Sequence, residues 1–279
     1  MIRALISICL LAATSYGAEV PTYIVIGQSN VGTPATNTMV YNRGSFPDSR
    51  VTLWSGVVGS LNLVSNQTLR APATKHWGIE MLAGQVLADW HNGENIAIVK
   101  VYKGGTSLHT DWEKGNTNGE ACYASLSNWF ASATADMAAI GNTPDVRGVM
   151  WMQGEDDAND GNHATYYANL TNFIADIRGD YGTNIRFGVG RLSRFAAWRA
   201  GLDTVRSAQE QAATDISNVY LVDSDPCHIP WNTASGRHDS HYSQQGLWDL
   251  GLRFGHGMTQ EKRGTLGASI WVRDDGWSE

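Results

Sequence analysis

A serine follows a short apolar run near the start of the chain, in the sequence from Tyr23 to Asn30. The β-branched residues of this run predict a buried strand over 23–26, and Gly27 allows the backbone to turn sharply after it. Ligands of open α/β sheets bind at the carboxyl ends of strands, so Ser29 is a candidate nucleophile if a histidine accepts its proton. An ordinary turn is the alternative. The second glycine of the G-x-S-x-G elbow is missing, which argues against a usual α/β-hydrolase.

Further candidate residues come directly after other predicted strands. Gly104 and Gly105 follow a strand predicted over 96–102, and Gln153 follows one over 147–152. His241 lies just before a predicted closing helix. Two more strands are expected over 185–189 and 219–222, and helices over 76–91, 122–140, 166–177 and 244–254. Alternating strands and helices predict a parallel sheet covered on both faces, whose rim would gather these side chains.

Composition and the first residues set the class of protein. The chain has 279 residues and a formal net charge of −7, with no basic cluster, so nucleic acid and anionic membrane surfaces are poor partners. Residues 1–17 are typical of a secretory signal peptide cleaved after Gly17, which predicts a secreted or periplasmic protein. Residues 18–279 then form one domain, with a core over about 20–258 and no segment that inserts in a membrane. The oligomeric state is not predicted.

Two cysteines follow the signal peptide. In an oxidising compartment Cys122 and Cys227 are typical of one disulfide, and two buried free thiols are the alternative.

Four motifs together resemble the SGNH hydrolase superfamily, and within it acetyl esterases of the sialate O-acetylesterase and carbohydrate esterase family 6 type. They occur in the family order and cover roughly residues 20–258. The motifs are Gly27-Gln28-Ser29-Asn30, Lys103-Gly104-Gly105-Thr106-Ser107, Trp151-Met152-Gln153-Gly154-Glu155, and Asp239-Ser240-His241-Tyr242-Ser243.

The resemblance implies a flavodoxin-like, three-layer α/β/α sandwich with a five-stranded parallel sheet. It also implies hydrolysis of an acetyl ester on a sugar or polysaccharide, with no cofactor and no metal. By the motifs, Ser29 is the nucleophile and His241 the general base, with an acyl-enzyme intermediate. The oxyanion hole consists of the backbone N–H groups of Ser29 and Gly105 and the side-chain amide of Gln153.

One position departs from the family pattern. The acid that orients the histidine usually precedes it by three residues, where this chain has His238. Asp239, two residues before His241, is the first candidate for this role. Glu155, expected mainly as a hydrogen-bond acceptor behind the site, is the second; Asp223, Asp225 or a backbone carbonyl are further possibilities.

Other readings stay open at this point. Histidines 228, 238 and 241 with Asp225 and Asp239 suggest a metal site, without a zinc spacing. Acidic residues at 156, 157 and 160 form either a solvated loop or a calcium site. Five further residues are either sugar contacts or plain surface positions, and the sequence favours neither: Arg191, Arg194, Trp198, His109 and Trp112. A carbohydrate-binding protein that has lost its chemistry is the rival to an esterase.

Overall fold

The computed structural model describes residues 17–32, 48–58, 64–69, 77–117, 119–196 and 199–259. Its centre is a seven-stranded sheet in the order β3-β2-β4-β1-β5-β6-β7. Neighbouring strands are parallel, except that β2 and β3 are antiparallel. The strands are β1 (Ala18–Gly27), β2 (Asp48–Val57), β3 (Val64–Leu69), β4 (Ile96–Tyr102), β5 (Asn142–Met152), β6 (Arg186–Gly190) and β7 (Val219–Val222).

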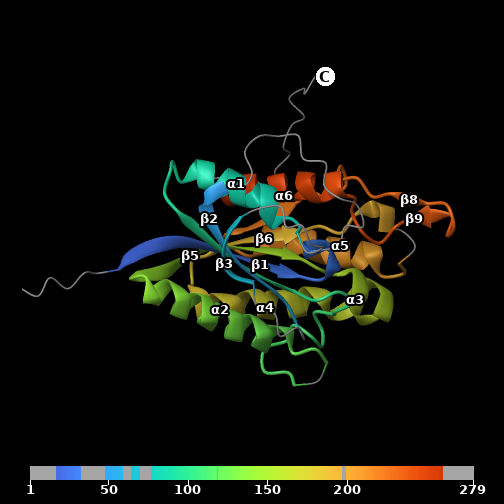
Figure 1. The fold of residues 1–279 in the computed structure, drawn as a ribbon. Helices are drawn as coiled ribbons and strands as arrows, with labels where there is room; N and C mark the ends of the chain where they lie inside the picture. The colour runs from blue at the N-terminus through green and yellow to red at the C-terminus, as the bar shows by residue number, and fades with distance from the viewer. Residues whose placement is uncertain are drawn as a thin grey trace, which may run out of the picture.

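Helices cover both faces of this sheet, so the predicted three-layer α/β/α sandwich is confirmed. One face carries α1 (Glu80–Trp90) and α6 (Gln244–Thr259), and the other carries α2 (Cys122–Ala139) and α4 (Tyr166–Tyr181) (Figure 1). The remaining elements are α3 (Glu155–Asp160), α5 (Leu202–Asp215), the short helices η1 (Ser29–Val31), η2 (Asn162–Thr165) and η3 (Arg194–Ala196), and a ribbon of β8 (Trp231–Asn232) and β9 (Arg237–His238).

The predicted number of five strands is wrong, because six strands are parallel and a seventh runs antiparallel at one edge. The five expected strands are β1, β4, β5, β6 and β7. Strand β2 was not predicted because its apolar residues are few and interrupted: Val51 and Trp54 are buried, while Ser49 is exposed and Arg50 is partly exposed. A half-buried strand near a sheet edge lacks the continuous apolar run that marked the central strands.

The central strands have the sequence that burial on two faces requires. All seven residues of β4 are buried, and so are the last seven of β1. Glycine lets α6 approach α1 closely on one face: a Cβ at Gly251 would lie 2.4 Å from the Ile79 carbonyl oxygen. The sheet is therefore a rigid frame, and its strand ends are fixed in position.

Cys122 and Cys227 are both free and buried, so the predicted disulfide is wrong. Cys122 begins α2, whereas Cys227 lies near Asp249 and Arg253 of α6, on the opposite side of the sheet (Figure 1). Burial raises the pKa of each thiol to about 12, which makes both unreactive as thiolates at neutral pH.

Two predictions concern residues that are not described. Of the predicted signal peptide, residues 1–17, all but Gly17 lie outside the described ranges, and so do residues 260–279 of the segment that follows the predicted core. None of the helices within the described ranges combines the length and apolar character needed to cross a bilayer.

Candidate active site

Ser29 and His241 meet at the carboxyl end of β1. Ser29 Oγ and His241 Nε2 are 3.0 Å apart, although 212 residues separate them in sequence. Gly27 makes the turn possible: its φ is +142°, and a Cβ there would lie 2.0 Å from the Met152 carbonyl oxygen. The His241 side chain is 40% exposed and Ser29 is partly exposed, so substrate can reach both. This geometry suits proton transfer from the hydroxyl to the imidazole.

The turn after β4 lies against the serine, as the motif order predicted. A Cβ at Gly104 would come within 3.4 Å of Ser29 Cβ, so this glycine leaves space directly beside the nucleophile. Gly105 is exposed and has a φ of +69°, in the left-handed region that favours glycine. The backbone of this turn can therefore approach a bound ester closely.

The Gln153 side chain is fully buried behind this turn. Its amide nitrogen donates to the Thr106 carbonyl oxygen at 2.9 Å and to Asp157 Oδ2 at 2.6 Å. Its oxygen accepts from the Tyr166 hydroxyl at 3.1 Å. Both amide hydrogens thus have protein acceptors here, and the oxyanion role of Gln153 stays a prediction that requires one of them to turn to the substrate.

Asp157 connects Gln153 to the loop that follows Gly105. Its two carboxylate oxygens accept from the backbone N–H groups of Leu108 at 2.8 Å and His109 at 3.2 Å. The prediction of a solvated acidic loop is wrong here, because residues 155–160 form α3 and Asp157 is fully buried. Composition indicated only an acidic cluster, because the backbone partners of Asp157 in Leu108 and His109 lie almost 50 residues away in sequence.

Asn30 ties the nucleophile turn to the histidine loop, a role that the sequence analysis missed. Its Nδ2 donates to the Ser240 carbonyl oxygen at 3.1 Å, and its Oδ1 accepts from the Tyr242 N–H at 3.2 Å. The same Nδ2 donates to Glu155 Oε1 at 2.6 Å. Because Ser240 and Tyr242 flank His241, this one buried amide fixes the histidine backbone relative to Ser29.

The predicted acid, Asp239, lies near His241 without a hydrogen bond to its ring. Asp239 Oδ1 is 3.9 Å from His241 Nδ1 and instead accepts from the Ser240 N–H at 2.6 Å. Burial lowers the pKa of His241 below its ordinary value; the nearby Asp239 carboxylate opposes this effect and the Arg199 guanidinium reinforces it. Asp239 therefore acts on the ring as a nearby charge, half exposed to solvent.

The other candidate acids are engaged elsewhere. Glu155 lies behind Asn30, and burial raises the pKa of its carboxyl group. Arg191 pairs with both Asp223 and Asp225, at 2.5 Å and 3.1 Å. Arg194 also binds Asp225, so neither arginine extends as an unpaired cation toward substrate. Trp198, which the sequence analysis grouped with these two arginines as a sugar contact or a surface position, lies outside the described residues.

The histidines of the metal hypothesis bind protein groups instead. His228 Nδ1 is 2.8 Å from the Ser243 hydroxyl, and His238 Nδ1 is 3.1 Å from the Ile229 carbonyl oxygen. In the part of the chain that the structure describes, no three His, Cys, Asp or Glu side chains gather as a metal site needs.

A buried ion pair supports the turn that carries Ser29. Lys100 Nζ and Glu80 Oε2 are 2.7 Å apart, with side chains 0% and 1% exposed. The other Glu80 oxygen accepts from the Gly78 N–H at 3.0 Å. Gly78 lies directly against η1, since a Cβ there would be 1.8 Å from the Val31 carbonyl oxygen. The ion pair thereby fixes the position of Gly78, which packs against the short helix that begins at Ser29.

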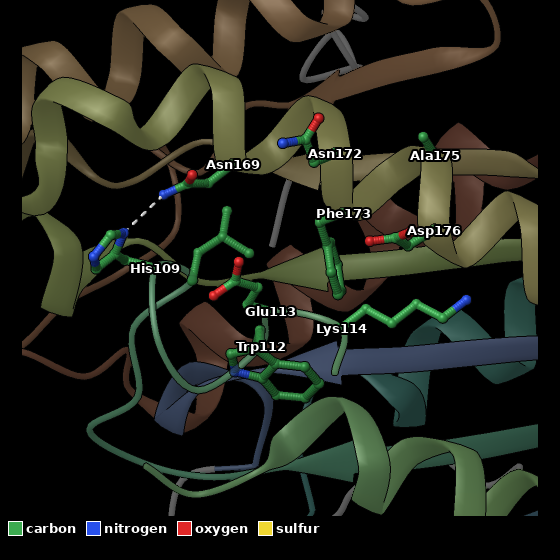
Figure 2. A pocket seen from close by; sticks show the side chains of 10 residues that line it. His109, Trp112, Glu113, Lys114, Asn169, Asn172, Phe173, Ala175 and Asp176 are labelled. Carbon is green, nitrogen blue, oxygen red and sulfur yellow. Dashed lines mark hydrogen bonds between the residues drawn. The ribbon is translucent and has the colours of Figure 1, made fainter. Parts of the chain in front are cut away.

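A cavity of about 330 Å³ lies between the loop after Gly105 and α4. Figure 2 shows the side chains of Trp112 and Phe173 on its wall, with His109 hydrogen-bonded to Asn169 at its edge. The sequence analysis left His109 and Trp112 open as sugar contacts or surface positions; Trp112 is fully buried, which excludes a surface position, whereas His109 is exposed. Ser29 and His241 do not line this cavity.

Comparison with known protein families covers the part of the chain that carries this site. A family model described as "Carbohydrate esterase, sialic acid-specific acetylesterase" matches residues 19–260, which include all four motifs. The chain belongs to this family. It is therefore a carboxylic ester hydrolase of the carbohydrate acetylesterase class, as the motifs predicted. No curated protein sequence matches the esterase significantly.

Solved structures with the same fold are distant in sequence. A protein from Arabidopsis thaliana is 18% identical, with a TM-score of 0.62 over 86% of this esterase and 98% of that chain. A carbohydrate acetylesterase from Xanthomonas citri is 17% identical, with a TM-score of 0.62 over 85% of this esterase but 55% of that chain. NanS is 14% identical, with a TM-score of 0.57 over 87% and 97% of the two chains. These likenesses show the fold.

Proposed function

We propose that this esterase is exported and removes acetyl groups from hydroxyls of a carbohydrate, with Ser29 as nucleophile and His241 as general base. The observation that carries the proposal is the 3.0 Å contact between Ser29 Oγ and His241 Nε2 at the rim of the sheet. Export is supported by the sequence of residues 1–17, which has the features of a signal peptide.

In the acylation step, Ser29 Oγ attacks the carbonyl carbon of the acetyl ester while His241 Nε2 accepts the hydroxyl proton. The tetrahedral intermediate then collapses. The bond to the sugar oxygen breaks, and the imidazolium returns its proton to that oxygen, so the free hydroxyl of the sugar leaves. The acetyl group remains on Ser29.

In the deacylation step, a water molecule gives a proton to His241 and attacks the acetyl-serine. The bond between Ser29 Oγ and the acetyl carbon then breaks, the imidazolium returns its proton to Oγ, and acetic acid leaves and ionises to acetate. A low His241 pKa favours both steps near neutral pH, since the imidazole must be uncharged to accept each proton.

Negative charge develops on the carbonyl oxygen in both steps and needs fixed donors. The proposed donors are the backbone N–H groups of Ser29 and Gly105, aided by Gln153. Gly104 leaves the space that the ester needs beside Ser29. Removing one such donor costs about 3 kcal/mol of transition-state stabilisation in serine hydrolases, so this group of donors supplies a large part of the rate.

The test is acetate release from a panel that contains 4-nitrophenyl acetate, acetylated xylo-oligosaccharides, acetylated pectic oligosaccharides and O-acetylated sialyllactose. The wild type should release acetate from 4-nitrophenyl acetate and at least one glycan, and Ser29→Ala and His241→Ala should each lose nearly all activity while keeping the wild-type Tm. A wild type that hydrolyses nothing in the panel would favour a carbohydrate-binding protein without chemistry.

A further inference from the structure

Three aromatic rings lie together at the β8–β9 ribbon, which precedes the loop that carries His241, the catalytic loop. Figure 1 shows the β8–β9 ribbon projecting beyond the body of the protein, at the same end as α3. Within the ribbon Trp231 pairs with His238 across the two strands, and their ring centroids are 5.1 Å apart. Phe195, from η3, also packs against the imidazole, with ring centroids 4.6 Å apart. His238 is therefore the central ring of a cluster.

The two outer rings of this cluster are unusually exposed. Trp231 is 57% exposed and Phe195 is 39% exposed, whereas most large apolar side chains of the described chain are buried. Each of these rings contacts His238, at interplanar angles of 89° for Trp231 and 48° for Phe195, so together they form an angled, exposed apolar patch. Clustered apolar surface of this kind marks binding sites more often than isolated apolar residues do.

His238 occupies the position, three residues before His241, at which the motif resemblance implies an acid, and its contacts place it in the ribbon. Its Nδ1 lies 3.1 Å from the Ile229 carbonyl oxygen, which orients the ring in the ribbon. The next residue, Asp239, donates its backbone N–H to the Pro230 carbonyl oxygen at 2.8 Å, so the ribbon continues into the catalytic loop. His241 is the third residue after His238, so the Cα atoms of the two histidines are at most about 11 Å apart.

We propose that Trp231, His238 and Phe195 form a stacking surface for a sugar ring of an oligosaccharide whose neighbouring residue carries the acetyl ester at Ser29. The inference rests on the proposed function and names its substrate class: acetylated oligosaccharides bound through more than one sugar. A pyranose ring has an apolar C–H face that suits an aromatic surface, with hydroxyls at its edge that stay in water. Membership in a carbohydrate esterase family and continuity with the His241 loop favour this occupant over a protein partner.

The experiment compares Trp231→Ala with the wild type on the acetylated oligosaccharides of the panel and on 4-nitrophenyl acetate. Loss of the stacking surface should raise KM for the best oligosaccharide about tenfold, with kcat little changed. Activity on 4-nitrophenyl acetate, which has no second sugar, should stay within twofold. Trp231→Phe should retain most of the affinity, and Phe195→Ala should show a smaller loss in the same direction.

Trp90→Ala is the matched control, since Trp90 is 53% exposed at the end of α1 and lies outside the cluster. It should leave all substrates unaffected. Equal KM values for wild type and Trp231→Ala on every oligosaccharide that is hydrolysed would overturn the proposal. So would a wild type that hydrolyses 4-nitrophenyl acetate and none of the oligosaccharides. Failure on every substrate would instead count against the proposed esterase function itself.

Discussion

Replacing Asn30 by alanine should damage both the stability and the catalysis of this esterase. The substitution removes the amide that binds Glu155, the Ser240 carbonyl and the Tyr242 N–H. Glu155 and Tyr242 are each 5% exposed, so water does not replace the lost partner. Leaving one buried polar group unsatisfied costs about 1–3 kcal/mol, and two such groups make a loss of about 3 kcal/mol reasonable.

That loss corresponds to a fall in Tm of roughly 6–12 °C for a domain of this size. The catalytic effect has a separate cause: the loop that carries His241 loses its two bonds to the Ser29 turn, and a displacement of about 1 Å at a catalytic group costs on the order of 100-fold in rate. Differential scanning calorimetry gives the first quantity, and kcat for 4-nitrophenyl acetate, measured well below the lowered Tm, gives the second.

Two variants separate the loss of the Asn30 bonds to the His241 loop from other effects of Asn30→Ala. Glu155→Gln keeps an oxygen that can accept from Asn30, so it should lose less than tenfold in kcat. Asn159→Ala changes an exposed asparagine whose bond is to its neighbour Asp160, and it should behave as the wild type. A wild-type kcat for Asn30→Ala would refute the view that this amide positions His241.

Three other predictions follow from the same contacts. The acid limb of the pH profile of kcat/KM should lie below pH 6.5, because His241 must be neutral to act and burial lowers its pKa. Asp239→Asn should move this limb to still lower pH and cost only a few fold in kcat, since the Asp239 carboxylate raises the pKa of His241; an unmoved limb would contradict this charge effect. Gln153→Ala should lower kcat on the order of 100-fold with little change in KM; a lower Tm with unchanged kcat would show that Gln153 only supports the loop. Lys100→Met should reduce the free energy of unfolding, measured in urea, by about 3–5 kcal/mol, because Glu80 is left buried without its cation, and the double variant with Glu80→Gln should recover part of that loss.

The central strands and the meeting of Ser29 with His241 could be predicted from the sequence. Residues 96–102 and 147–152 read as strands because burial on both faces demands a continuous apolar run. Parallel topology then brings the ends of such strands to one rim, so residues more than 200 positions apart were expected together. Strand β2 was missed because its edgeward position tolerates polar residues.

The supporting contacts of the site could not be predicted in the same way. Asn30 and Asp157 are buried polar residues, and the partners of a buried polar group are set by the three-dimensional packing rather than by a local pattern. Spacing alone suggested Asp239 as the acid, yet whether a carboxylate two residues away reaches the ring depends on the loop conformation. That loop turns the Asp239 carboxylate to the Ser240 N–H.

The most direct test of the account is to label the nucleophile. Incubating the wild-type esterase with a fluorophosphonate and mapping the peptides by mass spectrometry should locate a single adduct on Ser29, with loss of 4-nitrophenyl acetate hydrolysis in proportion to labelling. His241→Ala should slow the labelling at least 100-fold, because the hydroxyl then lacks its base. An adduct on another residue that abolishes activity, or full activity after complete labelling of Ser29, would contradict the assignment of Ser29 as the nucleophile.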